Sequence, residues 1–487
     1  MSQNGSNFKA GEFYIDTISI VNQENETVDV SKMCLGFKLY ESIYKKFCTG
    51  EVGIMDGLNL LRHYKFTGQE YLRISIKQKE GVDSEAPKEF SIDKTFRIYK
   101  VDFIERPQEL IQTYVMHLCE PRMFFSRRKR ISKTLRGSYD QMIQRILIDE
   151  AHFKPEEFDQ WTKTLPENKQ FISPNWSIDE LLNHFIQSSD TGTDESFRNS
   201  MFFYQTLNGG FRFTDFAKMC QQVFPIEFSF KPRNDQVDTD KTDLNAPSGL
   251  NTQILALEKP QLFDSLRGTV SGAYASTQHV FDPIRKIMED DIYDMDEVYQ
   301  RAGHVSGYPM MRLNNEERTL TTGDMIDPTV SPEVSEVDVD LAPNKEYESY
   351  VKYSSRMVHA FDDVADPTAP EVFEGSGKND NRMLERQALL EILQQNKIIV
   401  TIPLRTDLTV GMVVKLKIPT AETTDGNSTE DKVNDDKYLI TDICISGNPL
   451  KQEGVLYMEC VKESYARQIE GETPLREKSA PTKIEAK

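Results

Sequence analysis

The residues whose types and spacing could support catalysis are His117 and Cys119, in the run QTYVMHLCE. A spacing of two puts both side chains on one face of a β-strand, where an imidazole could accept a thiol proton, as in Cys/His peptidases. No Asn or Asp that would orient the imidazole is indicated nearby, so we interpret both residues as core packing. The six cysteines form no CxxC pair and the seven histidines no HxxxH pair. We therefore expect neither a zinc site nor a disulfide framework, but unpaired buried thiols.

Acidic residues could support two further kinds of chemistry. Asp290, Asp291, Asp294 and Asp296 have the side chains of calcium ligands, but the spacing lacks the Gly and the distal Glu of a calcium loop. We interpret them as a solvated acidic loop. Paired carboxylates could cleave a glycan, and 78 acidic residues provide every spacing. No compact helical segment is available to carry such an active site, so we predict no catalytic, cofactor-binding or metal-binding residue.

A basic cluster is the strongest local positive charge in the sequence. Its seven cations are Arg122, Arg127, Arg128, Lys129, Arg130, Lys133 and Arg136. A nucleic-acid surface would interleave such cations with stacking aromatics, and only Phe124 and Phe125 lie among them. We therefore favour a docking surface for an acidic neighbour, either the chain's own acidic segment or another protein.

The net charge of −20 is unevenly distributed along the 487 residues. Residues 1–232 sum to −2, residues 233–375 to −16 and residues 376–487 to −2. Such an acidic field repels phosphate backbones, which argues against a DNA-coating function. No run approaches the roughly 18 apolar residues of a membrane helix, and the N-terminus lacks the pattern of a signal peptide. We expect a soluble protein, made in the cytoplasm and not inserted in a membrane.

Residues 1–121 are rich in short β-like runs. The expected strands are Phe13–Val21, Gly36–Tyr44, Gly50–Asp56, Tyr71–Lys79, Lys94–Phe103 and Gln112–Cys119. In FRIYKVDF, simple alternation puts Phe96, Ile98, Lys100 and Asp102 on one face, as in a sheet with one buried side. Six short strands separated by turn residues indicate a barrel or a sandwich.

Residues 122–232 have the pattern of a small α+β module. Ser138 and Gln141 have the spacing of a capping box before one helix, and Ser177 and Glu180 have the same spacing before a second, SIDELLNHFIQ. The run NSMFFYQTLNGGFRFTDF then predicts a hairpin with its turn at residues 207–210.

The remaining chain falls into three parts. Residues 233–375 are polar and acidic, which indicates an insertion-rich domain with long loops. Residues 376–466 begin with a predicted helix, NRMLERQALLEILQQNK, and continue with four strand-like runs. In VLYMECV, Leu456, Met458 and Cys460 share one face. Residues 467–487 form a charged tail.

The C-terminal order of helix, T-I-P strand, G-M-x-V-K-L strand and two later strands resembles the second barrel of phage baseplate hub proteins. It is also similar to the hub part of type VI secretion spike proteins. The resemblance places the connecting helix at Arg382–Gln394 and the first strand at Ile398–Pro403. The later strands fall at Gly411–Ile418, Tyr438–Ile443 and Leu456–Val461.

The N-terminal run from LYES to YLRISI resembles the first barrel of hubs from contractile-tailed (myovirus) phages. Its matching parts are Glu41-Ser42, Gly50-Glu51, Asp56, Leu60-Leu61, Thr67-Gly68-x-Glu70 and the Leu72–Ile76 strand. Together the two regions cover roughly two fifths of the chain, in the family's order.

This resemblance implies an α+β, mainly β fold with two antiparallel β-barrel domains, a small α+β module and a long acidic insertion. The implied domains are a first tube-like barrel at 1–121, the module at 122–232, the acidic linking domain at 233–375, a connecting helix with the second barrel at 376–466, and the tail at 467–487. The family implies a structural, non-enzymatic homotrimer, whose six barrels join the six-fold tail tube to the three-fold central spike. Other baseplate proteins would be partners, phage DNA would pass through without specific binding, and no cofactor is implied. The expected location is the baseplate of the virion tail, assembled in the host cytoplasm.

Two alternatives stay open at this point. The chain could be the hub of a bacterial contractile injection system, in which a hub would act by the same physical principles within a different particle. It could also be a tail-associated cell-wall hydrolase or glycan-binding protein.

Overall fold

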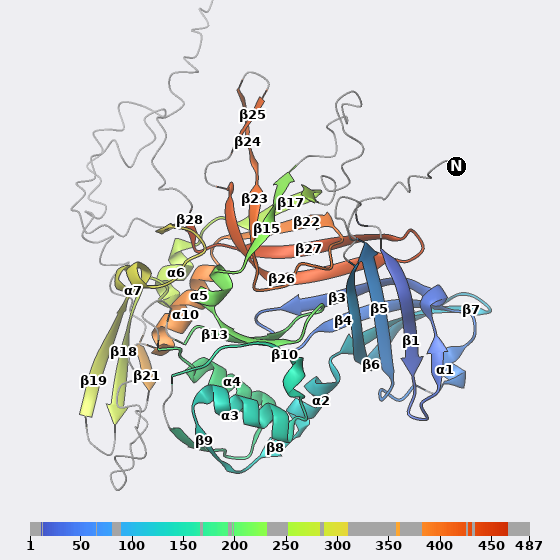
Figure 1. Ribbon diagram of the computed structural model, residues 1–487, viewed down its shortest axis with the longest axis horizontal. Helices are drawn as coiled ribbons and strands as arrows, with labels where there is room; N and C mark the ends of the chain where they lie inside the picture. Colours follow the sequence, from blue (N-terminus) through green and yellow to red (C-terminus); the bar gives the residue numbers. More distant parts are fainter. Residues whose placement is uncertain are drawn as a thin grey trace, which may run out of the picture.

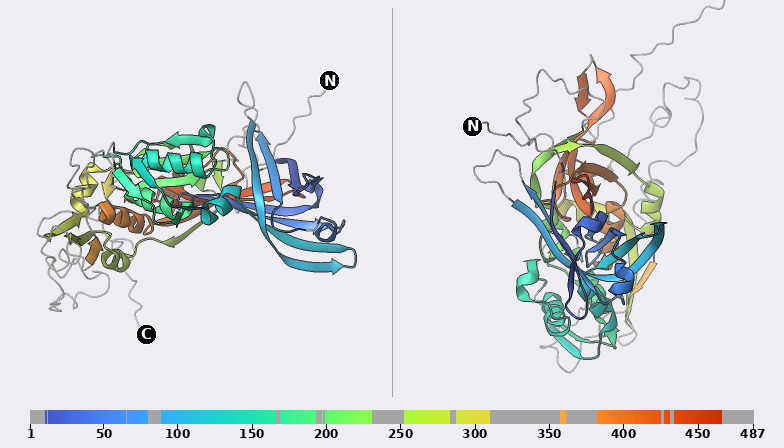
Figure 2. Two further views of the ribbon diagram at one scale, coloured as in Figure 1. Left: turned by 90° about the horizontal axis from the view of Figure 1, so that it is seen from below. Right: turned by 90° about the vertical axis from the view of Figure 1, so that its right-hand side faces the viewer.

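The computed structural model describes residues 11, 13–64, 66–79, 89–165, 169–192, 197, 199–230, 252–282, 287–309, 357–360, 382–424, 427–430 and 434–465. Strands predominate, and half of the described strands belong to one mixed sheet of 14 strands. The molecule is elongated, with the N-terminal strands at one end (Figures 1 and 2).

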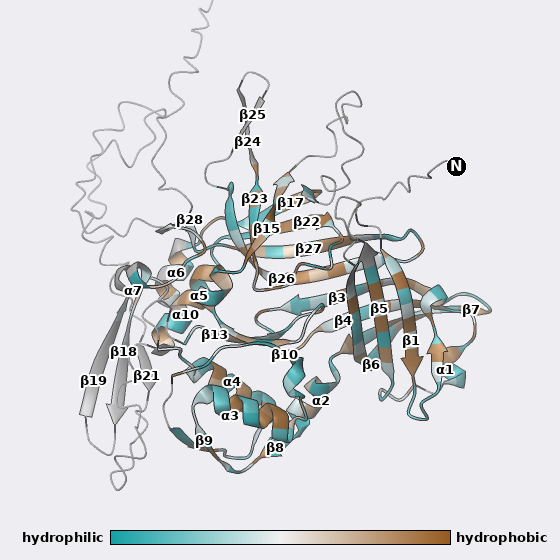
Figure 3. Ribbon diagram, viewed as in Figure 1, coloured by the Kyte–Doolittle hydropathy of each residue, from teal (hydrophilic) through white to brown (hydrophobic). Residues whose placement is uncertain are grey.

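The N-terminal sheet consists of seven antiparallel strands from consecutive chain. They are β1 (Tyr14–Val21), β2 (Thr27–Asp29), β3 (Cys34–Ser42), β4 (Thr49–Asp56), β5 (Tyr71–Lys79), β6 (Glu89–Gln108) and β7 (Ile111–Cys119), and the short helix α1 (Leu60–His63) follows β4. Their spatial order is β3-β4-β7-β6-β5-β1-β2. Hydrophobic and hydrophilic residues alternate along β1 and β5 (Figure 3), because successive side chains in a strand point to opposite faces. All six strands predicted in this region are confirmed.

The simple alternation predicted for FRIYKVDF is wrong. Phe96 and Ile98 are buried as expected, but the register of β6 against β7 shifts between Ile98 and Lys100 and again beyond Asp102. A β-bulge inserts an extra residue and exchanges the two faces of the strand. Phe103 has a positive φ of 50° and is 71% exposed.

The small module contains four helices and several short strands, and most of its buried apolar side chains form a second core. Its elements are α2 (Pro121–Arg128), β8 (Arg130–Ile131), β9 (Thr134–Gly137), α3 (Tyr139–Arg145) with a π-helical turn at Ile146–Glu150, a 3-10 turn at Pro155–Glu157, β10 (Phe158–Trp161), β11 (Lys169–Ile172), β12 (Trp176–Ser177), α4 (Ile178–Ser188), β13 (Met201–Gln205), β14 (Phe211–Asp215) and α5 (Phe216–Cys220). The predicted capping box at Ser177 forms, with Glu180 as its partner. Ser138 is the residue before α3, but its hydroxyl donates to the Asp140 carboxylate instead of capping the helix. The predicted hairpin is confirmed as β13 and β14.

The C-terminal strands come from three separated segments. They are β15 (Val223–Phe230), then β16 (Gln253–Ile254) and β17 (Ala256–Gln261), and finally β22 (Lys397–Pro403), β23 (Val413–Lys417), β26 (Asp436–Asn448) and β27 (Glu453–Val461) after the helix α10 (Arg382–Leu393). The alternation predicted for VLYMECV is confirmed, since Leu456, Met458 and Cys460 are fully buried.

The segment 253–261 pairs with two different strands. Its start, β16, lies parallel to β15, and its continuation, β17, lies antiparallel to β22. Between them the Leu255 N–H donates to the Thr401 carbonyl at 2.8 Å. One continuous stretch of nine residues therefore links the two ends of the series β15-β23-β26-β27-β22.

The other described elements extend from this body. They are α6 (Ser265–Ser271), β18 (Ala275–Asp282), β19 (Ile287–Asp294), α7 (Met295–Arg301), β20 (Tyr308–Pro309), β21 (Met357–Ala360), β24 (Pro419–Thr424), β25 (Asn427–Glu430) and β28 (Ser464–Tyr465). The sheet β19-β18-β21 stands at the end of the molecule opposite the N-terminal strands (Figure 1).

Strand β26 joins the sheets from the two ends of the chain. It pairs with β27 along one edge, and along the other edge first with β23 and then, from Asp442 to Gly447, with β3. A continuous hydrophobic core runs from Phe13 to Val461. Because β26 occupies the outer edge of β3, the described N-terminal strands do not close on themselves.

Candidate functional site

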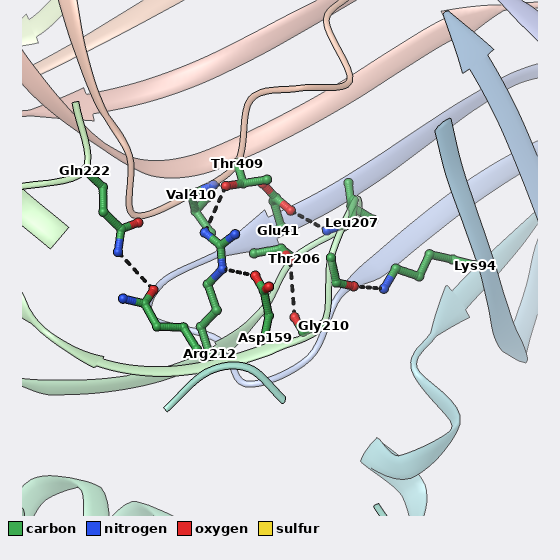
Figure 4. A network of polar contacts seen from close by, with 12 residues as sticks. Glu41, Lys94, Asp159, Thr206, Leu207, Gly210, Arg212, Gln222, Thr409 and Val410 are labelled. Atoms are coloured by element: carbon green, nitrogen blue, oxygen red, sulfur yellow. Dashed lines mark hydrogen bonds and ion pairs between the residues drawn. The ribbon is translucent and has the colours of Figure 1, made fainter. Parts of the chain in front are cut away.

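The most elaborate polar site lies where the N-terminal sheet, the small module and the C-terminal strands meet (Figure 4). We call it the three-way junction: Glu41 of β3, the turn at residues 206–210, and the loop at residues 406–411. At its centre, the Glu41 carboxylate is 3% exposed. Its Oε2 accepts the Leu207 N–H at 2.6 Å, and its Oε1 accepts the Val410 N–H at 2.9 Å. One side chain therefore links three parts of the chain.

Burial controls the charge of this carboxylate. Loss of solvent raises the pKa of Glu41 to about 7, although the two N–H donors and the nearby Arg212 and Lys94 act in the opposite direction. Near neutral pH the carboxyl group thus takes up or releases a proton inside the protein.

Turn chemistry positions the two backbone donors. The Thr206 N–H donates to the Gly210 carbonyl at 3.0 Å, which closes the β13–β14 turn and presents the N–H of Leu207. Gly411, next to Val410, has a φ of +81°. A Cβ at this position would lie 2.2 Å from the Tyr204 hydroxyl oxygen, so the loop requires glycine here.

Further side chains connect the same three regions. Arg212 of β14 donates through Nε to Asp159 Oδ2 at 2.7 Å and through Nη1 to Thr409 Oγ1 at 3.2 Å. Asn208 donates to the Thr406 carbonyl at 3.0 Å. Lys94 of β6 donates to the Gly209 carbonyl at 2.5 Å. These hydrogen bonds hold the three regions against one another.

A cleft of about 490 Å³ opens beside the junction and includes Lys94, Glu120 and Glu157 in its lining. Burial raises the pKa of Glu120, whose Oε2 accepts the Gln205 side-chain N–H at 2.8 Å. Burial also raises the pKa of the adjacent Cys48 thiol well above its usual value, which makes it a poor nucleophile. The cleft therefore offers charged and hydrogen-bonding side chains.

His117 and Cys119 share one face of β7, as expected, but the prediction that both are core packing is wrong for His117, which does have an Asp beside it. The His117 ring contacts Asp102 at 2.8 Å and Glu51 at 3.5 Å on the outer side of β7. Cys119 is buried, and burial raises the pKa of its thiol to about 11. All six cysteines are unpaired, and five of them are buried. No group of three or more His, Cys, Asp or Glu in the described part of the chain could hold a metal ion.

Within the described part of the chain, some cations of the basic cluster form ion pairs and others do not. Arg122 forms an ion pair with Glu157, and Lys129 and Lys133 both contact Glu150. The remaining members are exposed arginines: Arg127, Arg128, Arg130 and Arg136. The predicted acidic loop is wrong, because Asp290, Asp291 and Asp294 lie on the strand β19 and Asp296 lies at the start of the helix α7. The described backbone there is not a calcium loop.

Sequence reasoning missed Glu41 as a site residue, although a signal was present. Phe37, Leu39 and Glu41 alternate along β3, and all three are buried. A carboxylate at an inward-facing position of a strand needs hydrogen-bond donors, and these donors are supplied by residues 166 and 369 positions away.

None of the described helices has the length and apolar character needed to span a membrane. No protein-family model matches the chain, and no curated protein matches it.

Several solved structures are similar to this chain. A tail protein from Neisseria meningitidis aligns over 93% of this chain and 97% of its own, with 8% identity and a TM-score of 0.47. The prophage MuSo2 tail protein from Shewanella oneidensis aligns over 92% and 98%, with 8% identity and a TM-score of 0.45. An E. coli component of the type VI secretion system, similar in structure to the T4 bacteriophage tail proteins gp27 and gp5, aligns over 93% and 77%, with 8% identity and a TM-score of 0.39. These neighbours are phage tail and type VI secretion proteins.

Proposed function

We propose that this chain is the structural hub of a contractile phage-tail baseplate. The observation that carries the proposal is the join between β3 and β26, which connects strands from the two ends of the chain edge to edge. A hub acts through geometry, so it needs a rigid body that presents two comparable strand systems. The three-way junction adds rigidity, because hydrogen bonds from three regions converge on Glu41.

The proposed architecture contains two tube-like barrels. Support for the second barrel comes from the segment 253–261, which pairs with β15 at its start and with β22 over the rest. Support for the first comes from the curved seven-stranded order β3-β4-β7-β6-β5-β1-β2 and from the resemblance of residues 39–76 to hub proteins. We propose the domain boundaries at residues 121, 232, 375 and 466, with the charged tail after them.

In this function three copies form a ring between the six-fold tail tube and the three-fold central spike. Two strand systems per copy give six around the ring, which matches the symmetry on the tube side. DNA would pass through the ring during ejection, and the acidic balance of the chain would prevent adhesion to phosphates. The location would be the virion baseplate, after assembly in the host cytoplasm.

We infer a non-enzymatic role from the state of the candidate groups. Both oxygens of Glu41 accept backbone N–H groups, and the thiols of Cys48 and Cys119 are buried with raised pKa values. A hub of a bacterial injection system would have the same geometry, and genes for capsid proteins beside this gene would distinguish the phage particle from it.

The decisive experiment measures the mass and shape of the purified full chain. Mass photometry over a concentration series, with and without a co-expressed spike protein, should give a species of three copies. Negative-stain images of that species should show a three-fold ring with a central hole. A compact monomer under every condition would contradict the hub, and clearing of peptidoglycan in a zymogram would favour the hydrolase.

A further inference from the structure

Five exposed arginines of the small module form no ion pair within the described residues. We call them the arginine surface: Arg127, Arg128, Arg130, Arg136 and Arg145. They lie on α2, β8, β9 and α3, which are neighbours along the lower side of the molecule (Figure 1). The two lysines in the same stretch, Lys129 and Lys133, share the single carboxylate of Glu150. Guanidinium groups therefore carry most of the remaining positive charge.

The local structure holds some of these guanidinium groups in place. Arg130 donates through Nη1 to the Asn175 carbonyl at 3.1 Å, and Arg145 donates through Nη1 to the Arg136 carbonyl at 3.1 Å. Each keeps further N–H donors for a partner, and the planar guanidinium fork matches the geometry of a carboxylate. The net charge of the chain is −20, so five exposed arginines gathered in one module indicate a surface that binds an acidic partner.

The chain itself carries an acidic segment of matching size. The sequence of β19 and the first turn of α7, IMEDDIYDMDE, contains six acidic residues and no basic residue. We call residues 287–297 the acidic hairpin arm. It belongs to the sheet β19-β18-β21 at one end of the molecule (Figure 1).

We propose that the arginine surface of one copy binds the acidic hairpin arm of the next copy around the ring. This inference rests on the proposed homotrimer and assigns one of its contacts. Two different, complementary surfaces on the same chain make a heterologous interface, which forms a ring of three when the rotation between copies is 120°. Charge complementarity also fixes register and speeds association between copies that are all strongly acidic.

Nucleic acid is a poorer partner for this surface. Single-stranded binding requires exposed aromatic rings on which bases stack. Phe124, the exposed aromatic nearest to the arginines in sequence, is already covered by the Arg97 guanidinium, 4.4 Å from the ring centroid.

Charge reversal in the full-length protein tests the contact. One variant carries Arg127→Glu with Arg128→Glu, a second carries Asp290→Lys with Asp291→Lys, and a third combines all four changes. The first two should each raise the concentration at half-assembly of the trimer by roughly tenfold or more, and the combined variant should restore most of it. Added salt should weaken the wild-type trimer, since the Debye length falls from about 8 Å at physiological ionic strength to about 3 Å at 1 M.

A matched control reverses two exposed cations of the N-terminal region, Lys32→Glu with Arg62→Glu, and should leave assembly unchanged. Thermal unfolding of every variant shows whether it folds. Trimers that withstand both reversals would overturn this contact while the hub function stands. If the arginine reversal instead abolished retention of a short single-stranded DNA with the trimer intact, the surface would be assigned to nucleic acid. A wild-type chain that stays monomeric would overturn the hub itself.

Discussion

The N-terminal sheet and the C-terminal strands are built from similar strands but are assembled in different ways. Strands β1 to β7 come from residues 14–119 without interruption, and each pairs with strands nearby in sequence. The C-terminal strands are gathered from residues 223–230, 253–261 and 397–461. The first region is therefore specified largely by local pattern, whereas the second depends on contacts that only the folded chain can make. Strand β26 connects the two and makes their stabilities depend on each other.

The largest effect should come from a cavity at the join. Leu39 is fully buried on β3 and pairs with Ile445 of β26. Leu39→Ala should lower the free energy of unfolding by about 2–5 kcal/mol. Hydrogen exchange should show lost protection in β22, β26 and β27 as well as in β3 and β4, because both regions share one core. Loss confined to the N-terminal strands would show that the regions unfold separately. Leu110→Ala, at a site 85% exposed, is the control.

The next effect concerns the three-way junction and pH. The folded pKa of Glu41 is about 7, against a usual value of 4.5. As pH rises from 4.5 to 7, the unfolded chain releases this proton before the folded chain does, so stability falls through that window and then levels off. The total loss is about 3 kcal/mol.

Glu41→Gln removes this titration but leaves one backbone N–H facing an amide NH₂, a mismatch of about 1–3 kcal/mol at every pH. Between pH 5 and pH 8, the unfolding free energy of the wild type should therefore fall by about 3 kcal/mol relative to that of Glu41→Gln. Urea unfolding at a series of pH values measures it. Parallel pH curves for the two proteins would contradict a carboxyl group of raised pKa at the junction.

A smaller effect tests how closely the two regions approach. Gly447 of β26 pairs with Phe37 of β3, and a Cβ on it would lie 2.3 Å from Phe37 Cζ and 2.9 Å from Phe13 Cζ. Gly447→Ala should destabilise by about 1–3 kcal/mol through overpacking. Gly57→Ala, where a Cβ would meet nothing within 4 Å, is the matched control in thermal melts. Equal melting temperatures for the two variants would mean that the rings move aside freely.

The smallest effect lies at the far end of the N-terminal sheet. Phe103 is held at a φ of 50° and buries little of its ring. Phe103→Asn should change stability by less than about 1 kcal/mol, in the stabilising direction, because Asn tolerates the left-handed region better. Chemical denaturation measures this change, and a clear destabilisation would reveal a packing role for the ring.

Much of the fold could be predicted from the sequence because its signals are local. The strands of the N-terminal sheet, the Ser177 capping box, the β13–β14 hairpin, the helix α10 and the alternation of β27 each depend on residues within about ten positions of one another. For the same reason the bulges of β6 were missed. They arise from the pairing of β6 with β7, and the sequence of FRIYKVDF by itself contains no information on that partner strand.

The tertiary structure alone decided how these elements combine. Three features each include a contact between positions more than a hundred residues apart along the chain. They are the pairing of residues 253–261 with β22, the pairing of β26 with β3, and the hydrogen bond from Leu207 to Glu41. A local sequence pattern cannot predict which distant backbone N–H will donate to a buried carboxylate. The donor is determined by the packing of the whole core. The sequence by itself determined that Glu41 points inward. Only folding determined that it would link three regions.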